Sequence, residues 1–479
     1  MNGPVTSSRL DLSAFAEQSF AVLGLGVSGL SAATALRSAG ARVLAWDDND
    51  DRRAAARARG IEPADLNAQD LTNVSALVLS PGIPHGHPHS HPMIERARAA
   101  GCEILCDLEL LTRAEPNARY VGITGTNGKS TTTALIGHVL SELGIASAIG
   151  GNIGAPGLTL PPMGRSGVYV IEFSSYQLEL LPRAVIDVAI LLNITLDHLD
   201  RHGGIDGYIA AKRRIFDGQR AGQTAILGVD DDNCRAIFDD LSQSGAADVI
   251  AISTREARPG GVYIADGWLI DDRAGKAGRM LELASLETLP GLHNAQNVAS
   301  TFAACSAIAG ESVEAARIAD AIRTFPGLAH RQELVGCRGD VRFVNDSKAT
   351  NAEAVAHALA AYDNIYWIAG GIAKEGGIAT LAPLFERVRH TFLIGEAADD
   401  FANTIGDAIS MTCSGDLKTA IADAVAQIER DGADSAIVLL SPACASFDQF
   451  RSFEARGDVF RETVRKLDGF MPAERRGVA

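Results

Sequence analysis

The sequence has no pattern of closely spaced cysteines. Its seven cysteines are scattered along the chain, and no two of them have the Cys-x-x-Cys spacing of a zinc or redox site. An odd, dispersed set argues against a disulfide framework and is typical of proteins in a reducing cytosol. We therefore expect a cytoplasmic protein in which most cysteines are small buried apolar residues.

Long hydrophobic runs and excess positive charge are also missing. The first apolar run, residues 20–30, is interrupted by glycines, so we predict neither a signal peptide nor insertion into a membrane. Lysine and arginine number 43 against 59 aspartates and glutamates, which gives a net charge of -16. This balance argues against a nucleic-acid partner, so acidic small molecules must be held by local groups such as helix N-termini, lysine and arginine.

The length of the chain calls for more than one domain. At 479 residues it exceeds a typical single core, and a 47% share of hydrophobic residues provides apolar material for several. We predict an α/β protein of three domains, over residues 1–107, 108–327 and 328–479. The first and third are expected to be Rossmann-like, and the central one to be a P-loop-type ATPase domain with a mostly parallel sheet.

The stretch from Tyr120 to Thr133, YVGITGTNGKSTTT, has the order strand, glycine loop and helix. In such a loop the backbone N–H groups turn toward an anion, Lys129 can reach the outer phosphates of a nucleoside triphosphate, and Ser130 offers a hydroxyl to Mg²⁺. The generic pattern G-x-x-x-x-G-K-[ST] is incomplete, because Ile123 occupies the first glycine position. A glycine-rich turn with an ordinary surface lysine is the alternative.

Residues 20–48 have the pattern of a nucleotide-binding βαβ unit. A strand over 20–23 leads into GLGVSG, which fits G-x-G-x-x-G, and a second strand over 42–46 ends at Asp47. An acid at this distance is placed to read a ribose hydroxyl. The pattern predicts a bound nucleotide diphosphate and leaves its identity open. A strand over 76–79 then ends in SPGIP, a stiff turn at the carboxyl edge of the sheet.

Histidines alternate along HGHPHSHP, at His85, His87, His89 and His91. In an extended segment they would share one side and could capture a metal ion. No carboxylate or cysteine nearby in the sequence completes a site. We therefore predict a solvated loop that binds metal only adventitiously.

Polar residues in the middle segment follow apolar strands. Glu172 lies in a buried-type strand over 168–173, where a carboxylate is costly unless it binds a metal or forms a buried salt bridge. His198 follows the strand over 188–192 and is either a metal-site or a structural histidine. The amides Asn294 and Asn297 share one helix face and could read a base or a ribose, although Asn294 alone could be a cap.

The third segment follows a linker over 327–331. Strand-like runs at 341–344, 365–369, 391–394 and 436–440 alternate with helical stretches. Two of these strands end in polar loops, NDSKATN and SPACASFDQF. Loops bearing Lys, Ser and Thr at strand ends suit a small carboxylate substrate, although ordinary turn chemistry would explain either loop by itself.

Taken together, these motifs resemble the Mur ligase family, ATP-dependent amide-forming enzymes of bacterial cell-wall precursor synthesis. TGTNGKST, at residues 124–131, is the variant phosphate loop typical of that family. The asparagine at 127, the absence of an Asp-Asn-Pro-Arg signature and the stretch SPACASFDQF are most similar to the members that add D-glutamate. The resemblance covers essentially the whole chain.

The resemblance implies three small-molecule substrates: ATP, UDP-N-acetylmuramoyl-L-alanine and D-glutamate. ATP would phosphorylate the alanyl carboxylate to an acyl phosphate, which the amine of D-glutamate then attacks. The expected context is peptidoglycan synthesis, and through it cell wall biogenesis, cell shape, cell division and the cell cycle. The expected protein is a monomer.

The resemblance also implies roles for individual residues. ATP would be bound by Gly125, Thr126, Asn127, Gly128, Lys129, Ser130, Thr131, Asn294, Asn297, Arg331 and Asp346. The UDP precursor would be bound by Val27, Ser28, Asp47, Ser80, Gly82, Asn152 and His198. D-glutamate would be bound by Lys348, Thr350, Ser446 and Phe453. Two Mg²⁺ ions would be held by Ser130, Glu172, His198 and a carbamylated Lys212. The catalytic residues would be Lys129, Glu172, His198 and Lys212.

By pattern alone Lys212 is one more cation on a helix, and only the resemblance gives it a role. The stretch Arg201-His202-Gly203-Gly204 departs from the pattern expected for the family. Three other functions remain open. A nicotinamide-dependent oxidoreductase would leave the Lys129 loop unexplained, a non-catalytic nucleotide-binding regulator would form no ADP, and a folate-polyglutamate ligase would have no use for the first domain.

Overall fold

The computed structural model of the chain describes residues 9–286, 288–310, 313–374 and 376–473. Contacts divide them into two compact units. The first contains the described residues up to 283 together with 295–323, and the second contains 284–294 together with the described residues from 324 onward. Within the described residues, no helix has both the length and the apolar character needed to cross a bilayer.

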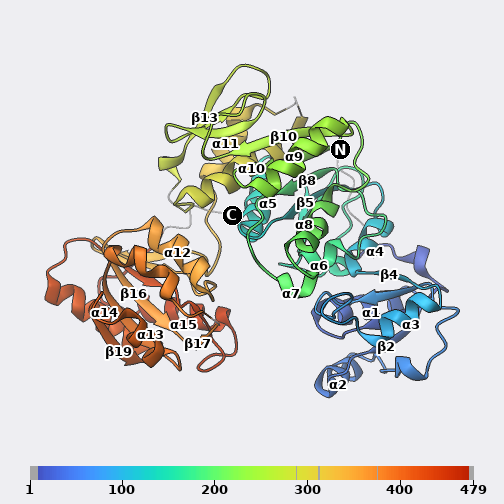
Figure 1. Cartoon of the computed structure of the whole chain (residues 1–479), viewed down its shortest axis with the longest axis horizontal. Coiled ribbons are helices and arrows are strands. Elements are labelled where there is room, and N and C mark those ends of the chain that lie inside the picture. Colours follow the sequence, from blue (N-terminus) through green and yellow to red (C-terminus); the bar gives the residue numbers. More distant parts are fainter. Residues whose placement is uncertain (1–8, 287, 311–312, 375, 474–479) are drawn as a thin grey trace. The chain divides into compact units, whose positions relative to one another are not determined.

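The first sheet is parallel throughout and belongs to the first unit (Figure 1, blue). Its spatial order is β2 (Arg42–Trp46), β1 (Ser19–Leu23), β3 (Ala76–Leu79) and β4 (Glu103–Leu105). The helices of this part are α1 (Val27–Ser38), α2 (Asp50–Ala58), α3 (Pro92–Ala99) and α4 (Asp107–Ala114). The three strands predicted here are confirmed. The sequence between β1 and α1 contains the glycine loop, so the loop lies at the carboxyl end of β1.

The central sheet is also part of the first unit (Figure 1, green). Its spatial order is β13 (Gly278–Glu282), β12 (Trp268–Asp271), β11 (Val262–Ala265), β10 (Asp248–Ser253), β9 (Thr224–Gly228), β8 (Val188–Leu191), β5 (Arg119–Thr124), β7 (Val168–Glu172) and β6 (Ser147–Gly151). Neighbours are parallel from β11 to β6 and antiparallel from β11 to β13. The mostly parallel sheet predicted for this part is confirmed.

The strand β5 lies between β8 and β7, so the loop that follows it opens at the carboxyl edge of the sheet, where open α/β sheets hold their ligands. The helices of this part are α5 (Lys129–Glu142), α6 (Ser175–Leu178), α7 (Leu199–His202), α8 (Ile205–Arg213), α9 (Asp232–Ser244), α10 (Leu292–Ala309) and α11 (Ala315–Arg323). The division between the two units falls within the first turn of α10.

The glycine-rich stretch over 150–154, whose sequence GGNIG suggests a flexible turn throughout, is a turn only in its later part. Gly150 and Gly151 are the last residues of β6 and pair with Ile171 and Glu172 of β7. A side chain at Gly151 would meet the backbone carbonyl of Glu172. The glycines therefore permit close strand pairing there, and the turn begins at Asn152.

The second unit contains the third sheet (Figure 1, orange to red). Its order is β19 (Met411–Gly415), β18 (Val388–Ile394), β16 (Ile365–Gly370), β20 (Ala436–Leu440), β15 (Val341–Asn345), β14 (Glu333–Arg338) and β22 (Met471–Pro472), with a separate ribbon of β17 (Ile372–Ala373) and β21 (Cys444–Ala445). The helices are α12 (Ala352–Ala361), α13 (Ala398–Ile405), α14 (Leu417–Asp431) and α15 (Phe453–Val464).

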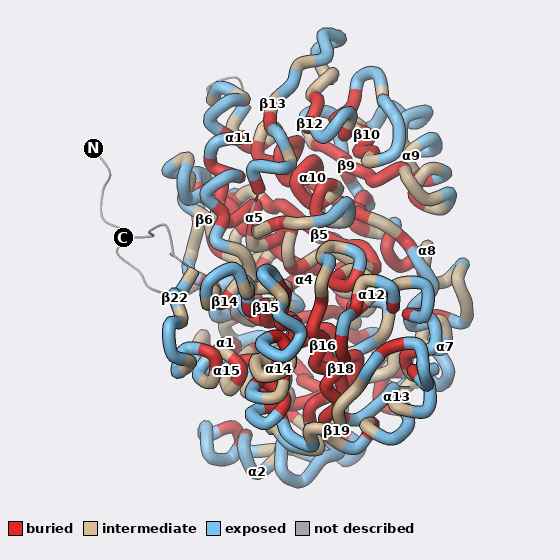
Figure 2. The backbone as a smooth tube through the Cα atoms, turned by 90° about the vertical axis from the view of Figure 1, so that its left-hand side faces the viewer, coloured by how far each residue is buried: buried red, intermediate tan, exposed pale blue. Residues whose placement is uncertain are grey.

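Helices cover both faces of this third sheet. Along β16, Trp367 packs into a core with α12 and α13, whereas its neighbours Tyr366 and Ile368 pack into a second core with α14 and α15. The strand is therefore an uninterrupted apolar run, as expected for a strand buried on both sides, and Figure 2 shows β16 and β18 as buried. The prediction of three α/β parts is confirmed, and the residues assigned as domain boundaries stay a prediction.

Candidate functional site

The phosphate loop connects β5 to α5 through two glycines with positive φ, Gly125 (151°) and Gly128 (85°). Only glycine adopts such angles without strain. The amine of Lys129 folds over the loop and donates to the carbonyls of Gly125 and Thr126, at 2.8 and 2.7 Å. The lysine is therefore held directly above the loop that was predicted to bind phosphates, as part of the first turn of α5.

Residues that follow β8 fix the shape of this loop. The side chain of Asn193 accepts from the N–H of Asn127 at 2.8 Å and donates to its carbonyl at 3.2 Å. Thr126 Oγ1 accepts from the N–H of Thr195 at 3.0 Å. Asn193 also donates to Gln296 of α10 at 2.9 Å. These bonds satisfy backbone groups that the glycine loop would otherwise leave unpaired.

The structure places the two predicted amides of α10 differently. Asn297 is buried, and its side chain accepts from Thr132 of α5 at 3.2 Å. A side chain at Gly128 would collide with Asn297, so the phosphate loop packs directly on this amide. Asn294 donates to the carbonyl of Pro290 at 2.7 Å, a local contact within the second unit. Asn297 thus packs against the phosphate loop, and its contact with ATP stays a prediction.

Glu172 ends β7 with only 1% of its surface exposed. Its Oε1 accepts from Asn152 at 2.7 Å, whereas its buried Oε2 has no hydrogen-bond partner among the described residues. A buried carboxylate oxygen without a partner is costly, and carboxylate oxygen is a ligand that Mg²⁺ prefers. Because Oε1 bonds to an uncharged amide and Oε2 has no hydrogen-bond partner among the described residues, the geometry favours a metal ligand over the salt-bridge alternative. Ser130 is buried in the first turn of α5.

Lys212 is buried in α8, and its amine donates to the carbonyl of Gly125 at 2.7 Å. The amine also lies 4.6 Å from the ring centroid of Tyr208. Burial lowers the pKa of Lys212 well below its usual value, and the charge of Lys129 lowers it further. A larger fraction of this amine is therefore neutral than for an exposed lysine.

His198 adopts a left-handed backbone conformation (φ 51°) at the start of α7. Its ring is half-exposed and lies 3.5 Å from the carboxylate of Asp197, with Tyr176 at a centroid distance of 5.4 Å. Burial lowers the pKa of His198 below its usual value. Among the described residues no three His, Cys, Asp or Glu side chains cluster as a preformed metal site. The predicted metal ligands are Ser130, Glu172, His198 and a carbamylated Lys212, and only two of these four are of the residue types that form such a cluster.

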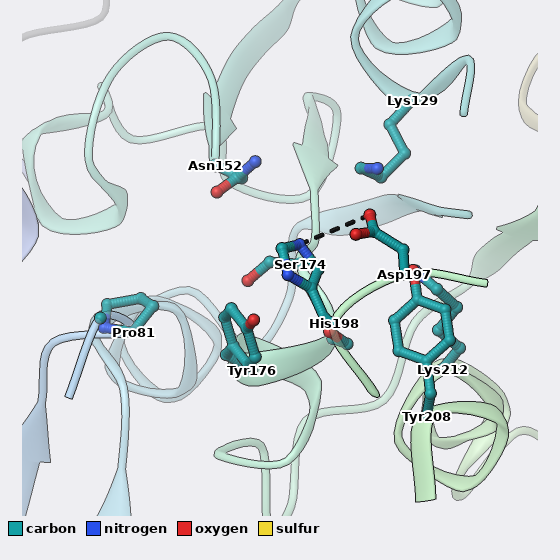
Figure 3. A pocket seen from close by; sticks show the side chains of 11 residues that line it. Pro81, Lys129, Asn152, Ser174, Tyr176, Asp197, His198, Tyr208 and Lys212 are labelled. Carbon is teal, nitrogen blue, oxygen red and sulfur yellow. Dashed lines mark ion pairs between the residues drawn. The ribbon is translucent and has the colours of Figure 1, made fainter. Parts of the chain in front are cut away.

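A pocket of about 310 Å³ brings these groups together (Figure 3). Its lining comprises Pro81, Gly82, Lys129, Asn152, Ser174, Ser175, Tyr176, Asp197, His198, Tyr208 and Lys212. Figure 3 shows Pro81 at one end, Tyr208 and Lys212 at the other, and the carboxylate–imidazole pair between them. Four of the predicted site residues thus line one pocket: Gly82 of the first domain, Lys129 of the phosphate loop, His198 and Lys212.

The glycine loop after β1 is tied together by Asp47 and Ser80. Asp47 is buried, and its carboxylate accepts from the N–H of Leu25 at 2.6 Å and from Arg52 at 3.3 Å. Ser80 donates to the carbonyl of Gly24 at 2.8 Å. Asp47 therefore holds the loop in this structure, and its contact with a ribose stays a proposal.

The next predicted residues are at the start of α1. Val27 is 78% exposed and Ser28 is partly exposed. They begin a twelve-residue helix, so the helix N-terminus and an apolar side chain are both open to a ligand at the carboxyl edge of the first sheet.

In the second unit, the two predicted polar loops meet around Arg456. This buried arginine donates to the hydroxyl (3.0 Å) and carbonyl (2.9 Å) of Ser347 and to the carbonyl of Cys444 (3.0 Å). The amine of Lys348 lies 5.2 Å from the ring centroid of Phe453. Ser446 is buried, and Thr350 is partly buried on the first of the two loops.

Asp346 directly follows β15 and is buried beside Ser441, which donates to it at 2.7 Å, and Gln332, whose N–H donates at 3.1 Å. Burial raises the pKa of Asp346 to about 7, although both hydrogen bonds and the charge of Arg331 act in the opposite direction. The charge of Arg331 thus acts on Asp346, and these are the two residues predicted to contact ATP from the third segment.

Several functional side chains were not singled out from the sequence. Tyr176 and Tyr208 line the pocket, Asn193 and Gln296 brace the phosphate loop, and Arg456 ties the loops of the second unit. Tyr208 could have been found, because it lies four residues before Lys212 on the same helix face. The others have no local signal, since each acts on a segment distant in sequence.

The histidine loop is not merely solvated. His87 and His89 are exposed, as predicted, but His85 lies 3.0 Å from Glu179 and His91 lies 3.1 Å from Asp48. His91 also caps α3 by accepting from the N–H of Met93. The prediction failed for these two because their carboxylate partners are remote in the sequence.

Comparison with known domain families gives three matches that together span most of the chain. Residues 18–106 match the Mur ligase MurD-like N-terminal domain, residues 123–305 the Mur ligase middle domain, and residues 330–444 the Mur ligase glutamate ligase domain.

Curated relatives match over nearly the full length. The UDP-N-acetylmuramoylalanine--D-glutamate ligase of Rhodospirillum rubrum is 49% identical over 95% of both chains. The ligase of the same name from Paramagnetospirillum magneticum is 50% identical over 93% of this chain and 96% of its own. That of Caulobacter vibrioides is 49% identical over 95% of this chain and 97% of its own.

Solved structures share the fold at low identity. The UDP-N-acetylmuramate-alanine ligase MurC of Thermotoga maritima superposes with a TM-score of 0.55 at 16% identity, covering 94% of this chain and 100% of its own. A pseudomurein peptide ligase type C of Methanothermus fervidus has a TM-score of 0.55 at 15% identity, covering 94% and 99%. These likenesses concern the three-domain α/β fold alone.

Proposed function

Because the chain belongs to the Mur ligase family, we propose that it joins D-glutamate to UDP-N-acetylmuramoyl-L-alanine in peptidoglycan precursor synthesis, with ATP as the source of energy. The observation that carries this proposal is identity of about one half, over nearly the full chain, with ligases of that name. The oxidoreductase and regulator alternatives lose their basis with this family membership. A folate-polyglutamate ligase would have no use for the first domain. The match of residues 18–106 to a MurD-like N-terminal domain therefore argues against that alternative.

The chemistry requires activation of a carboxylate. A carboxylate repels an approaching amine and has no good leaving group, so phosphorylation to an acyl phosphate must come first. Lys129 now donates to two carbonyls of its own loop, and we propose that its amine turns to the phosphate oxygens of ATP. The buried, unpartnered Oε2 of Glu172 and the hydroxyl of Ser130 would hold Mg²⁺. When bound, Mg²⁺ neutralises the charge of the anions that must approach each other.

A carbamate at Lys212 belongs to this proposal. Its neutral amine would form an N–C bond to carbon dioxide and release a proton, which turns a cation into an anion able to bind metal. The lowered pKa of Lys212 supports this step, because carbamylation requires the neutral amine. With His198, the carbamate would hold the second of two Mg²⁺ ions.

The substrate ends would be held by different parts of the chain. We propose that Val27, Ser28, Asp47, Ser80 and Gly82 contact the UDP moiety, and that Asn152 and His198 contact the precursor near its reacting end. We propose that Lys348, Thr350, Ser446 and Phe453 frame D-glutamate, and that Asn294, Asn297, Arg331 and Asp346 contact ATP. The predicted cytoplasmic location, monomeric state and roles in cell division and the cell cycle also stay proposals.

A phosphate-release screen tests the proposal. Purified protein would be given ATP, Mg²⁺ and UDP-N-acetylmuramoyl-L-alanine together with D-glutamate, L-glutamate or L-lysine. We expect phosphate release only with D-glutamate, and none when the sugar precursor is omitted. ATP consumption that is identical with and without the two acceptor substrates would overturn the proposed function.

A further inference from the structure

Two features of the sequence have no role in the proposed reaction: the histidine-rich loop after β3 and the unusual stretch Arg201-His202-Gly203-Gly204. In the structure they lie against each other within the first unit. The guanidinium of Arg201 donates to the carbonyl of Gly82 at 3.5 Å. A side chain built at Gly203 would collide with the ring of His87, so these residues are in close contact.

The centre of this contact is a carboxylate shared by two histidines. Glu179, which follows α6, has Oε2 at 3.0 Å from His85 Nε2 and Oε1 at 3.5 Å from His202 Nδ1. His85 comes from the loop after β3 and His202 from the end of α7. Burial by itself would raise the pKa of Glu179, but the approach of both histidines lowers it to about 2. Glu179 therefore stays ionised throughout the range in which proteins are normally handled.

The His202 ring connects this carboxylate to the pocket. Its Nε2 lies 2.9 Å from the hydroxyl of Ser175, and its plane stacks on Tyr176 at a centroid distance of 5.3 Å and an angle of 12°. The guanidinium of Arg201 also lies over the Tyr176 ring, 4.6 Å from its centroid. Both Ser175 and Tyr176 line the pocket.

The loop after β3 lines the same pocket through Pro81 and Gly82. Only a few residues separate these from His85. The bond between His85 and Glu179 thus links the loop that carries Pro81 and Gly82 to the segment that follows Ser175 and Tyr176, and all four of these residues line the pocket.

We propose that His85, Glu179 and His202 form a positioning unit that holds the loop carrying Gly82 against α7 and so sets the affinity for the UDP-sugar substrate. This inference rests on the proposed function for the identity of that substrate. The three residues do not touch the reacting atoms. They act through Gly82, Ser175 and Tyr176, which face the pocket.

The test compares the full-length variants Glu179→Gln, His85→Asn and the combination of both with the wild-type protein. Glutamine keeps the shape of Glu179 but removes its charge. We expect each single variant to raise the KM for UDP-N-acetylmuramoyl-L-alanine about tenfold, corresponding to a coupling of about 1.4 kcal/mol. The KM for ATP and kcat should change less than about twofold, because the phosphate loop has its own supports. The double variant should be no worse than either single variant.

His89→Ala is the matched control, since His89 is an exposed histidine of the same loop. It should leave all three kinetic constants unchanged. The proposal would be overturned if the variants raised the KM for ATP as much as the KM for the sugar substrate. It would also be overturned if the effects of His85→Asn and Glu179→Gln on the latter KM were additive in free energy. If Glu179→Gln fails to fold, His202→Gln tests the same unit from its other side.

A second readout does not depend on the identity of the substrate. In amide hydrogen exchange of the free protein, Glu179→Gln should speed exchange in residues 81–91 and 199–204 about tenfold, with no change in the phosphate loop. If the wild-type protein shows no ligase activity but Glu179→Gln still speeds exchange in both segments, the proposed function fails and the positioning unit stands. If Glu179→Gln leaves exchange in both segments unchanged, the proposal of a positioning unit is wrong.

Discussion

Replacing Asp346 by asparagine should stabilise the second unit at neutral and alkaline pH. The carboxylate of Asp346 is buried, and its pKa is raised from the usual 3.8 to about 7. Between these two pH values the carboxyl group of Asp346 is ionised in the unfolded chain but still protonated in the folded protein. The stability of the wild-type protein therefore falls as pH rises from about 4 to about 7, and the loss is complete above pH 7.

Each pKa unit corresponds to about 1.4 kcal/mol, so the loss over roughly three units is at most about 4 kcal/mol. Asparagine has the same shape and carries no charge. Its carbonyl oxygen can still accept from Gln332, and its amide can donate to the hydroxyl of Ser441 that now donates to Asp346. Allowing for imperfect hydrogen bonds, we expect Asp346→Asn to gain about 1–3 kcal/mol at pH 8 and close to nothing at pH 4.

Amide hydrogen exchange of β15 and β20 measures this gain, because it reports the opening free energy of the second unit within the full chain. Asp340→Asn is the matched control, since Asp340 is exposed in the turn between β14 and β15. Ligase activity should fall in Asp346→Asn despite the gain in stability, as expected for a costly group kept for ATP binding. A stability change that is the same at pH 5 and pH 8 would refute the reasoning.

Three further substitutions address the first unit. Lys129→Ala should lower phosphate release by at least about 10³-fold, because it removes the amine proposed to turn from the loop carbonyls to the phosphate oxygens of ATP, while UDP-precursor binding measured by calorimetry should survive; equal loss of both would contradict the division of labour. Lys212→Ala should be inactive and partly rescued by formate or acetate in the phosphate-release assay, and full activity without rescue would remove the carbamate from the account. Glu172→Gln should abolish Mg²⁺-dependent ATP binding, because an amide cannot replace the carboxylate oxygen Oε2 as a metal ligand. The unfolding midpoint of the magnesium-free variant should be unchanged or higher than that of the wild-type protein. Unaltered magnesium dependence of ATP binding would argue against Glu172 as a ligand.

Much of the architecture could be predicted from local patterns. The strands over 20–23, 42–46 and 436–440 were placed correctly because apolar runs bounded by glycine, proline or polar residues have few other solutions in an α/β protein. The phosphate loop was predicted for the same reason, since its glycines, Lys129 and the helix start are contiguous. The prediction that Asn297 contacts ATP depended on a family resemblance and stays a prediction, and the structure adds that Asn297 packs on this loop and accepts from Thr132.

Other parts of the site depend on contacts that no local pattern contains. Asp47 has the spacing of a ribose-binding acid, and the structure adds that its carboxylate accepts from Leu25 and Arg52, while its contact with a ribose stays a prediction. The histidine loop was predicted to be solvated, but two of its members find carboxylates 94 and 43 residues away. A carboxylate that binds a backbone N–H and one that binds a ligand look the same in a sequence. Only their surroundings in the folded chain distinguish them.

The amino-acid sequence by itself determined the succession of strands and helices and the position of the phosphate loop, because backbone conformation and burial pattern depend mainly on neighbouring residues. Tertiary structure alone decided which buried polar atoms remain open for a ligand, such as Oε2 of Glu172, and which are already satisfied. It also decided that His85, Glu179 and His202 meet. The physical reason is that hydrogen bonding and desolvation depend on every group within a few ångströms, and the fold draws those groups from distant segments.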